Sequence, residues 1–224
     1  MTPPEAVIFD MDGVIVNSEP HHEKAFLQVV RELGYGDNHG LRFTDYVGRS
    51  DQELWIDFVA KNKPAHSLEE LLLRKRRLVV EIIRREQPLF EGLPALVEQL
   101  SRKYRLAVAS GSDRAVVDEV LALKNLRRCF GAIITSAEVE RGKPAPDIFL
   151  RAAELLAVAP RDCWVIEDSK PGVCAGLAAG MRVIAITNTH PAAELAQATC
   201  VVKTYAEIER LLLVPARQAI TTRA

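Results

Sequence analysis

The sequence predicts an α/β fold in which a parallel β-sheet lies between two layers of helices and carries a small inserted helical domain. Two patterns support this fold. Short apolar runs rich in β-branched residues recur through most of the 224 residues, separated by segments of helical period. From about residue 18 to residue 88, by contrast, only helical patterns occur. A chain of this length can bury a substantial core, so we expect one large domain with a smaller insert.

The apolar runs that predict strands lack the polar alternation of a half-exposed sheet. Both faces of these strands are therefore expected to lie beneath helices, as in a parallel, three-layer, Rossmann-like sheet. The segments between the runs place apolar residues on one helical face, as residues 113–126 and 147–157 do. The predicted strands are residues 6–10, 105–110, 132–135, 163–167, 182–187 and 200–203.

The region without strands contains two clear helical patterns. The first covers residues 21–34 and is expected to end at Gly34. The second is long and begins at Ser67, which forms a capping-box pattern with Glu70 three residues later. These patterns indicate a small domain made of helices.

This helical insert is called the cap below, and its limits follow from where the α/β pattern stops and restarts. The sequence predicts a cap at residues 17–88 and a core domain formed by residues 1–16 and 89–224. Within the cap, Trp55 and Phe58 are expected to pack in its apolar interior rather than to stack against a ligand.

The charge balance argues against two classes of partner. Lysine and arginine total 29 and aspartate and glutamate 30, so the chain has no global positive field that would hold nucleic acid or an anionic membrane surface. No stretch approaches the roughly 18 apolar residues that a membrane span needs. We therefore expect no nucleic-acid partner and no membrane partner.

The cysteines favour a reducing compartment. All four are widely spaced, form no C-x-x-C motif and partly lie within apolar runs, so they are expected to be small core residues with free thiols. We expect a cytoplasmic protein that is a monomer or a weak dimer. The four residues are Cys129, Cys163, Cys174 and Cys200.

Polar residues that can do chemistry follow the predicted strands. In an open parallel sheet the ligand site lies beyond the carboxyl ends of the strands, so these residues are expected to meet at one edge. Four carboxylates cannot stay ionised together near one point without a cation. The candidates are Asp10 and Asp12 after the first strand, Ser110, Gly111 and Ser112 after the second, Lys143 in the third unit, and Glu167 and Asp168 after the fourth.

The residue types indicate the ligand. Hard oxygen ligands without a neighbouring histidine or cysteine favour Mg²⁺. A lysine and a hydroxyl beside that metal suit phosphate, because Lys143 offers a compact positive charge and Ser110, with nearby backbone N–H groups, can donate to phosphoryl oxygens. The sequence therefore predicts a site for a phosphoryl group.

Together these motifs resemble those of the haloacid dehalogenase superfamily. Stretches such as FDMDGVIVNSEPHH, GKPAPDIF and EDSKPGVCAGLAAGM are similar to the branch that contains β-phosphoglucomutase, sugar-phosphate phosphatases and phosphoglycolate phosphatase. The insert resembles that superfamily's helical cap. The motifs that carry the resemblance are Asp10-x-Asp12-Gly13, Ser110, Lys143-Pro144 and Glu167-Asp168-Ser169, in this order.

The resemblance implies a two-step phosphoryl transfer. Asp10 would be the nucleophile and form an aspartyl-phosphate, and Asp12 would act as general acid and then general base. Mg²⁺ would be held by the Asp10 side chain, the Asp12 carbonyl and Asp168. Lys143 would neutralise charge, and Ser110 with Gly111 would bind the phosphoryl oxygens. Glu167 would bind the metal either directly or through another ligand.

Three cap residues are candidates for contacts with the substrate: His22, Arg49 and Lys75. By resemblance, His22 aligns with a mutase histidine that couples cap closure to the general acid. Lys75 belongs to a basic run, residues 74–77, that is expected to be a solvated helix face, with one member able to reach the substrate. Mutases commonly carry an arginine three residues after a cap glycine, whereas here that position is Asp51 and Arg49 directly follows the glycine.

These observations favour a phosphatase that hydrolyses a small phosphorylated metabolite, with two alternatives. One alternative is a phosphosugar mutase of the β-phosphoglucomutase type, which the lack of an arginine at position 51 disfavours. The other is a non-catalytic, phosphate-binding regulatory module. Dehalogenase and phosphonatase activities are disfavoured because those relatives lack an acidic residue at the position of Asp12.

Overall fold

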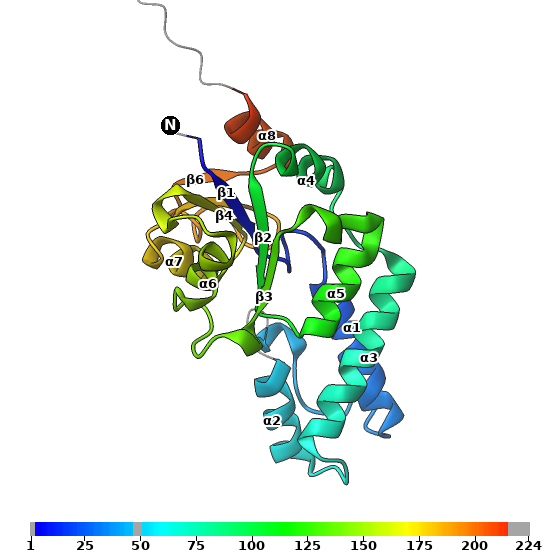
Figure 1. The fold of residues 1–224 in the computed structure, drawn as a ribbon. Coiled ribbons are helices and arrows are strands. Elements are labelled where there is room, and N and C mark those ends of the chain that lie inside the picture. Colours follow the sequence, from blue (N-terminus) through cyan, green and yellow to red (C-terminus); the bar gives the residue numbers. More distant parts are fainter. Residues whose placement is uncertain (1–2, 47–50, 215–224) are drawn as a thin grey trace, which may run out of the picture.

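The computed structural model describes residues 3–46 and 51–214. Within them, one six-stranded sheet has the order β3-β2-β1-β4-β5-β6, and all its strands are parallel (Figure 1). The predicted strands are confirmed to within one residue at each end. Their bounds are β1 Ala6–Phe9, β2 Arg105–Ser110, β3 Ala132–Thr135, β4 Cys163–Glu167, β5 Arg182–Ile186 and β6 Cys200–Val202.

Strand β1 lies at the centre and its two neighbours come from distant parts of the chain. Phe9 is in register with Val108 of β2 and with Ile166 of β4. The chain builds outward from β1 in one direction through β2 and β3 and in the other through β4, β5 and β6. The residues that follow β1 therefore lie at the point where the strand order reverses, which is where open α/β sheets bind ligands.

Helices cover both faces of the sheet, as predicted. Successive β1 side chains point to opposite faces: Val7 and Phe9 pack with α4, α5 and α8, whereas Ala6 and Ile8 pack with α6 and α7. Figure 1 shows α6 and α7 on one side of the strands and α5 on the other. The helix bounds are α4 Leu93–Ser101, α5 Arg114–Ala122, α6 Asp147–Leu156, α7 Lys170–Ala178 and α8 Tyr205–Leu213.

Helix α5 ends earlier than the sequence pattern indicates. The pattern predicts a helix through residue 126, but α5 stops at Ala122. Lys124 and Asn125 then adopt left-handed backbone conformations inside the 3₁₀ segment Leu123–Cys129. Asparagine tolerates that conformation better than most residues. The spacing of apolar residues does not change where the helix ends, so it could not predict this break.

The cap consists of α1 Glu19–Glu32, the 3₁₀ turn η1 Phe43–Tyr46, α2 Asp51–Asn62 and α3 Leu68–Glu86. These helices share an apolar cluster in which Trp55 and Phe58 are fully buried around Phe26, as expected. The capping box of α3 is confirmed, since the Ser67 backbone N–H donates to Glu70 Oε2 (2.8 Å) and the Glu70 N–H donates to Ser67 Oγ (3.2 Å).

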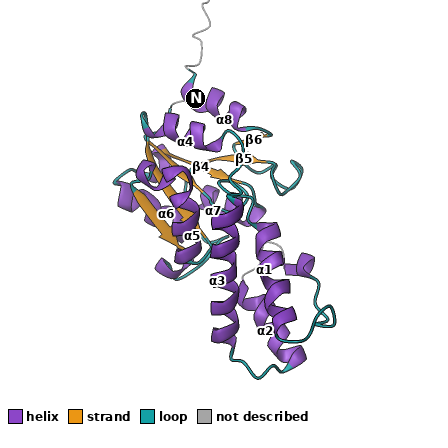
Figure 2. Ribbon diagram, turned by 90° about the vertical axis from the view of Figure 1, so that its right-hand side faces the viewer, coloured by secondary structure: helices purple, strands orange, loops and turns teal. Residues whose placement is uncertain are grey.

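The chain enters and leaves the cap at adjacent points. The Asn17 backbone N–H donates to the Pro88 carbonyl over 2.9 Å, and Val16 forms a bridge with Leu89. In both views the cap helices extend beyond one end of the sheet (Figures 1 and 2). The division into a core and a cap with these boundaries stays a prediction. In the part of the chain that the structure describes, no helix is long and apolar enough to cross a membrane.

Candidate active site

The predicted site residues of the core meet at the carboxyl ends of the central strands. Asp10 directly follows β1, Ser110 ends β2, and Glu167 ends β4 with Asp168 next to it. These four side chains are buried, although all are polar. Because buried polar groups need partners, their contacts show how the site is organised.

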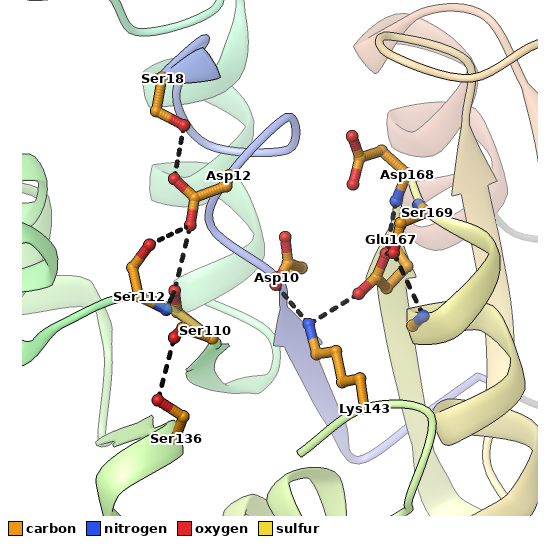
Figure 3. A network of polar contacts seen from close by, with 12 residues as sticks. Asp10, Asp12, Ser18, Ser110, Ser112, Ser136, Lys143, Glu167, Asp168 and Ser169 are labelled. Carbon is orange, nitrogen blue, oxygen red and sulfur yellow. Dashed lines mark hydrogen bonds and ion pairs between the residues drawn. The ribbon is translucent and has the colours of Figure 1, made fainter. Parts of the chain in front are cut away.

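Lys143 connects two of the buried carboxylates (Figure 3). Its ammonium contacts Asp10 Oδ1 and lies 2.7 Å from Glu167 Oε1. Burial alone would lower the pKa of Lys143, but the charges of Asp10 and Glu167 raise it above its ordinary value. The lysine is therefore a fixed cation beside the Asp10 carboxylate.

Glu167 uses both of its oxygens within the site. Oε2 accepts from the backbone N–H groups of Asp168 and Ser169, each over 2.8 Å, and from Ser169 Oγ over 2.9 Å. Oε1 faces Lys143. Ser169 also caps α7, since its hydroxyl accepts from the Gly172 N–H over 3.2 Å. Glu167 thus ties together the start of α7 and the lysine.

Asp10, Glu167 and Asp168 form a buried acidic cluster in which one carboxylate oxygen from each lies within 4.8 Å of the others. Burial, with the charge of Glu167, raises the pKa of Asp168 to about 7. Burial also raises the pKa of Asp10 well above its ordinary value, with Lys143 opposing that shift. Neighbouring carboxylates repel each other when ionised, and a bound cation relieves that repulsion. Their oxygens are also the ligands that a hard divalent cation prefers, so these residues fit Mg²⁺.

Asp12 lies in the turn after β1, two residues beyond Asp10. Met11 is fully buried and points away, and Gly13 has a positive φ of 76°. A Cβ atom at Gly13 would lie 1.8 Å from Asp168 Oδ2, so the close approach of this turn to the acidic cluster requires glycine.

Three hydroxyl groups point at Asp12 (Figure 3). Ser18 Oγ donates to Oδ1 over 2.5 Å, and Ser112 Oγ donates to Oδ2 over 2.7 Å. Ser110 Oγ lies 3.3 Å from the same Oδ2 and accepts from the Ser112 N–H over 3.0 Å. Ser110 therefore lies between Asp12 and the loop that contains Gly111, whose carbonyl accepts from Ser136 Oγ over 2.9 Å.

Ser112 was among the polar residues expected after the second strand, but no role was predicted for it, and Ser18 was not among the predicted site residues. Ser112 lies two residues after Ser110 in the same loop, and Ser18 precedes α1, where a serine is usually interpreted as a helix cap. The available signal for these two serines was their closeness in sequence to Ser110 and Asp12.

A second group of contacts, also not predicted, holds the turn after β1 from the other side. Asn188 Nδ2 donates to the Gly13 carbonyl over 2.7 Å and contacts Tyr205 Oη over 2.9 Å. Tyr205 Oη donates to the Val14 carbonyl over 2.7 Å, and Thr189 Oγ1 donates to Asp168 Oδ2. These residues fix the position of the turn and the orientation of the Asp168 carboxylate.

In the cap, two of the three candidate residues meet. The buried Lys75 ammonium lies 3.1 Å from His22 Nδ1 and contacts Asp51 Oδ1. The expectation of a solvated basic face holds for Arg74 and Arg77, which are exposed, but it is wrong for Lys75, because α3 packs this position against α1 and α2. The third candidate, Arg49, lies outside the described residues.

Burial and charge set the state of this cap cluster. Burial lowers the pKa of Lys75, and the Asp51 carboxylate opposes that shift. Burial would raise the pKa of Asp51, but contacts with His22 and Lys75 hold it well below its usual value. Asp51 is therefore an anion paired with the cation.

The parallel six-stranded sheet with helices on both faces is a Rossmann-like fold. The chain belongs to the haloacid dehalogenase-like hydrolase family, whose family model matches residues 7–186. This family is the one that the motifs predict.

Two relatives with named activities are similar to most of the chain. Hexitol phosphatase B of Escherichia coli is 32% identical over 185 residues, covering 81% of this chain and 82% of that protein. Fructose-1-phosphate phosphatase YqaB of Escherichia coli is 31% identical over 180 residues, covering 80% of this chain and 94% of that protein. The solved structure of a putative β-phosphoglucomutase from Thermotoga maritima superposes with a TM-score of 0.74 at 29% identity, covering 93% and 98% of the two chains.

Proposed function

We propose that the protein is a Mg²⁺-dependent phosphatase that hydrolyses a small phosphomonoester, such as a sugar phosphate, through an aspartyl-phosphate on Asp10. The observation that carries this proposal is the position of the Asp10 carboxylate. It lies against the Lys143 cation and the acidic cluster, at the carboxyl end of β1, with Asp12 two residues beyond it. The relatives named as sugar-phosphate phosphatases support the same activity.

In the first step, an Asp10 carboxylate oxygen attacks phosphorus and the bond from phosphorus to the leaving oxygen breaks. Asp12 gives a proton to that oxygen, so the leaving group departs as an alcohol. In the second step, Asp12 takes a proton from a water molecule, which attacks phosphorus and breaks the bond to Asp10. Inorganic phosphate is released and both aspartates return to their starting states.

The serines around Asp12 prepare it for proton transfer. Ser18 and Ser112 each donate to a different oxygen of its carboxylate, which fixes the orientation of the group. A positioned general acid and base typically contributes about 10² to 10⁴ in rate.

Lys143, Ser110 and Gly111 are assigned to the phosphoryl group. Lys143 neutralises negative charge on the phosphoryl oxygens, and its contact with Glu167 keeps it aimed at Asp10. Ser110 Oγ and the Gly111 N–H lie at the end of β2, where they can donate to the same oxygens. These groups favour the transition state because their positions are fixed before the substrate arrives.

The metal ligands are assigned to Asp10, the Asp12 carbonyl and Asp168. Bound Mg²⁺ would act as a Lewis acid and offset the repulsion between carboxylate and phosphate. Glu167 is assigned a positioning role, because both of its oxygens already have donors within the protein. It acts on the metal site through Asp168 and on the phosphate through Lys143.

The test is phosphate release from para-nitrophenyl phosphate and a panel of phosphorylated metabolites, with Mg²⁺ or with a chelator. We expect wild type to release phosphate only with Mg²⁺ and Asp10→Asn to be inactive. If neither wild type nor Asp10→Asn releases phosphate from any substrate of the panel, the result contradicts the proposal and favours a non-catalytic phosphate-binding module.

The similarity to a putative β-phosphoglucomutase keeps a mutase as the second candidate. Product analysis separates the two activities, since a phosphatase yields free phosphate and a mutase yields an isomeric sugar phosphate.

We also propose that the core and the cap are separate domains with the predicted boundaries, and that the protein works in the cytoplasm as a monomer or weak dimer. The four free cysteines suit a reducing compartment.

A further inference from the structure

The cap holds a cation whose charge is cancelled inside the protein. The side chain of Lys75 is 1% exposed, and its ammonium contacts the Asp51 carboxylate. Three helices provide this cluster, since Lys75 lies on α3, His22 on α1 and Asp51 at the start of α2. Because the two opposite charges are in contact, the cluster offers a ligand no net positive charge.

This cluster is connected to the catalytic pocket. The backbone N–H of His22 donates to the Ser18 carbonyl over 2.9 Å, and the Ser18 hydroxyl donates to Asp12 Oδ1 over 2.5 Å. His22 in turn lies 3.1 Å from Lys75 Nζ through its Nδ1. Since Asp12 is assigned to protonate the leaving oxygen, the cluster lies on the side of the leaving group.

The hydrogen-bonding capacity of the cluster is mixed. The Lys75 ammonium has only donors, and His22 Nδ1 lies 3.1 Å from Lys75 Nζ and 3.7 Å from Asp51 Oδ2. The Asp51 carboxylate has only acceptors, and its side chain is 43% exposed, so it is the member most accessible to a ligand. A hydroxyl group can both donate and accept, and it suits such a set.

A second phosphate on the substrate does not suit it. A phosphate dianion has only acceptors, so it would meet the acceptor-only Asp51 carboxylate with like charge. The cation that would attract it is already paired. A neutral group with several hydroxyls meets no such penalty.

We propose that Asp51, Lys75 and His22 form a leaving-group subsite that selects a neutral polyhydroxy group and discriminates against a substrate with a second phosphate. This assignment rests on the proposed function, because it uses the role of Asp12 to define the leaving-group side. The substrate class is then the monophosphates of sugars or sugar alcohols. Asp51 is the residue that sets the discrimination.

Equilibrium binding tests the subsite without turnover. In the Asp10→Asn protein with Mg²⁺, isothermal titration calorimetry compares fructose 1-phosphate with fructose 1,6-bisphosphate, which differ only in the second phosphate. We expect the monophosphate to bind more tightly. Adding Asp51→Asn is expected to shift the ratio of the two Kd values towards the bisphosphate by about tenfold or more, because a like charge is removed and Lys75 is released.

Two further variants keep the test interpretable. Asp51→Asn leaves a buried lysine without its anion, which destabilises a fold, so thermal unfolding is recorded for each protein. Asp51→Asn combined with Lys75→Met removes both charges and is expected to return the ratio towards that of the parent. Asp57→Asn is the matched control, because it removes the same charge from the same helix at a residue that pairs with Tyr46.

The outcomes distinguish a failure of the proposed subsite from a failure of the proposed function. A parent protein that prefers the bisphosphate, that binds neither ligand measurably, or whose ratio is unchanged by Asp51→Asn overturns the subsite. Hydrolysis of para-nitrophenyl phosphate by wild type is measured separately. Its absence would contradict the proposed function, while the binding ratios still report on the subsite.

Discussion

The carboxylate of Glu167 holds the ammonium of Lys143 at 2.7 Å, and it does so with a side chain that is fully buried. The other oxygen of Glu167 accepts three hydrogen bonds from the turn into α7. One residue therefore fixes both the cation and the backbone next to Asp168. The phosphate side and the metal side of the proposed site are coupled through Glu167.

Replacing Glu167 by glutamine is the direct test of this coupling. The amide keeps the shape but places an NH₂ group towards either Lys143 or the backbone N–H donors, so one set of contacts is lost. We expect kcat/KM for a phosphomonoester to fall by about 10- to 100-fold, the range typical for residues that orient metal ligands. Steady-state kinetics at saturating and limiting Mg²⁺ measures this effect.

The control for Glu167→Gln is Glu154→Gln, which removes the same charge from an exposed residue that pairs with Arg151. It is expected to leave kcat/KM unchanged. Equal kinetics for the two variants would show that Glu167 does not position the site.

Asp12→Asn tests the proposed proton transfer. An amide cannot protonate the leaving oxygen or activate water, so we expect kcat to fall by about 10² to 10⁴. The loss should be larger for an alkyl phosphate than for para-nitrophenyl phosphate, because the aryl leaving group needs little protonation. A loss of the same size for both substrates would exclude Asp12 as the general acid.

The serines that hold Asp12 are expected to matter through its orientation. Ser112→Ala removes a 2.7 Å hydrogen bond to a charged group, which typically contributes about 1.5–3 kcal/mol, so we expect kcat to fall by roughly tenfold or more with little change in KM. Ser101→Ala is the control, because that hydroxyl bonds only the Glu98 carbonyl among the described residues. A rise in KM alone would instead assign Ser112 to substrate binding.

The fold and the centre of the site could be predicted because both depend on strong, local patterns. Apolar runs without alternation define buried parallel strands, and the residues that end such strands must meet at one edge. Asp10, Ser110 and Glu167 could be predicted because each lies at the end of a strand or directly after it. Ser18, which donates to Asp12, could not be found this way, because it precedes a helix and directly follows no strand.

The cap was harder to predict for a physical reason. Lys75 belongs to a run of four basic residues, which normally faces water, and its burial depends on how α3 packs against α1 and α2. The spacing of residues within α3 cannot show that an anion on another helix, here Asp51, will pair with Lys75. Counting from the cap glycine identified Asp51 as a departure from the mutase pattern, but only the structure shows that it pairs with Lys75.

The acidic cluster predicts how stability depends on pH in the metal-free protein. Burial and then Glu167 raise the pKa of Asp168 to about 7, whereas its ordinary value is 3.8. The folded state therefore binds a proton more tightly than the unfolded state. The stabilisation that this proton provides is fully present below the ordinary pKa and is lost as pH rises through about 7.

With a chelator present, we expect the free energy of unfolding to fall between about pH 4 and pH 7, by up to about 1.4 kcal/mol per pH unit for each such proton. Denaturant unfolding at several pH values measures it. Asp168→Asn cannot ionise and should flatten this part of the profile, whereas Asp147→Asn, a partly exposed carboxylate paired with Arg141, should not. Mg²⁺ should stabilise wild type more at pH 8 than at pH 6, because the metal binds the deprotonated carboxylates. A profile for Asp168→Asn that runs parallel to wild type would show that this carboxyl is ordinary in the folded state.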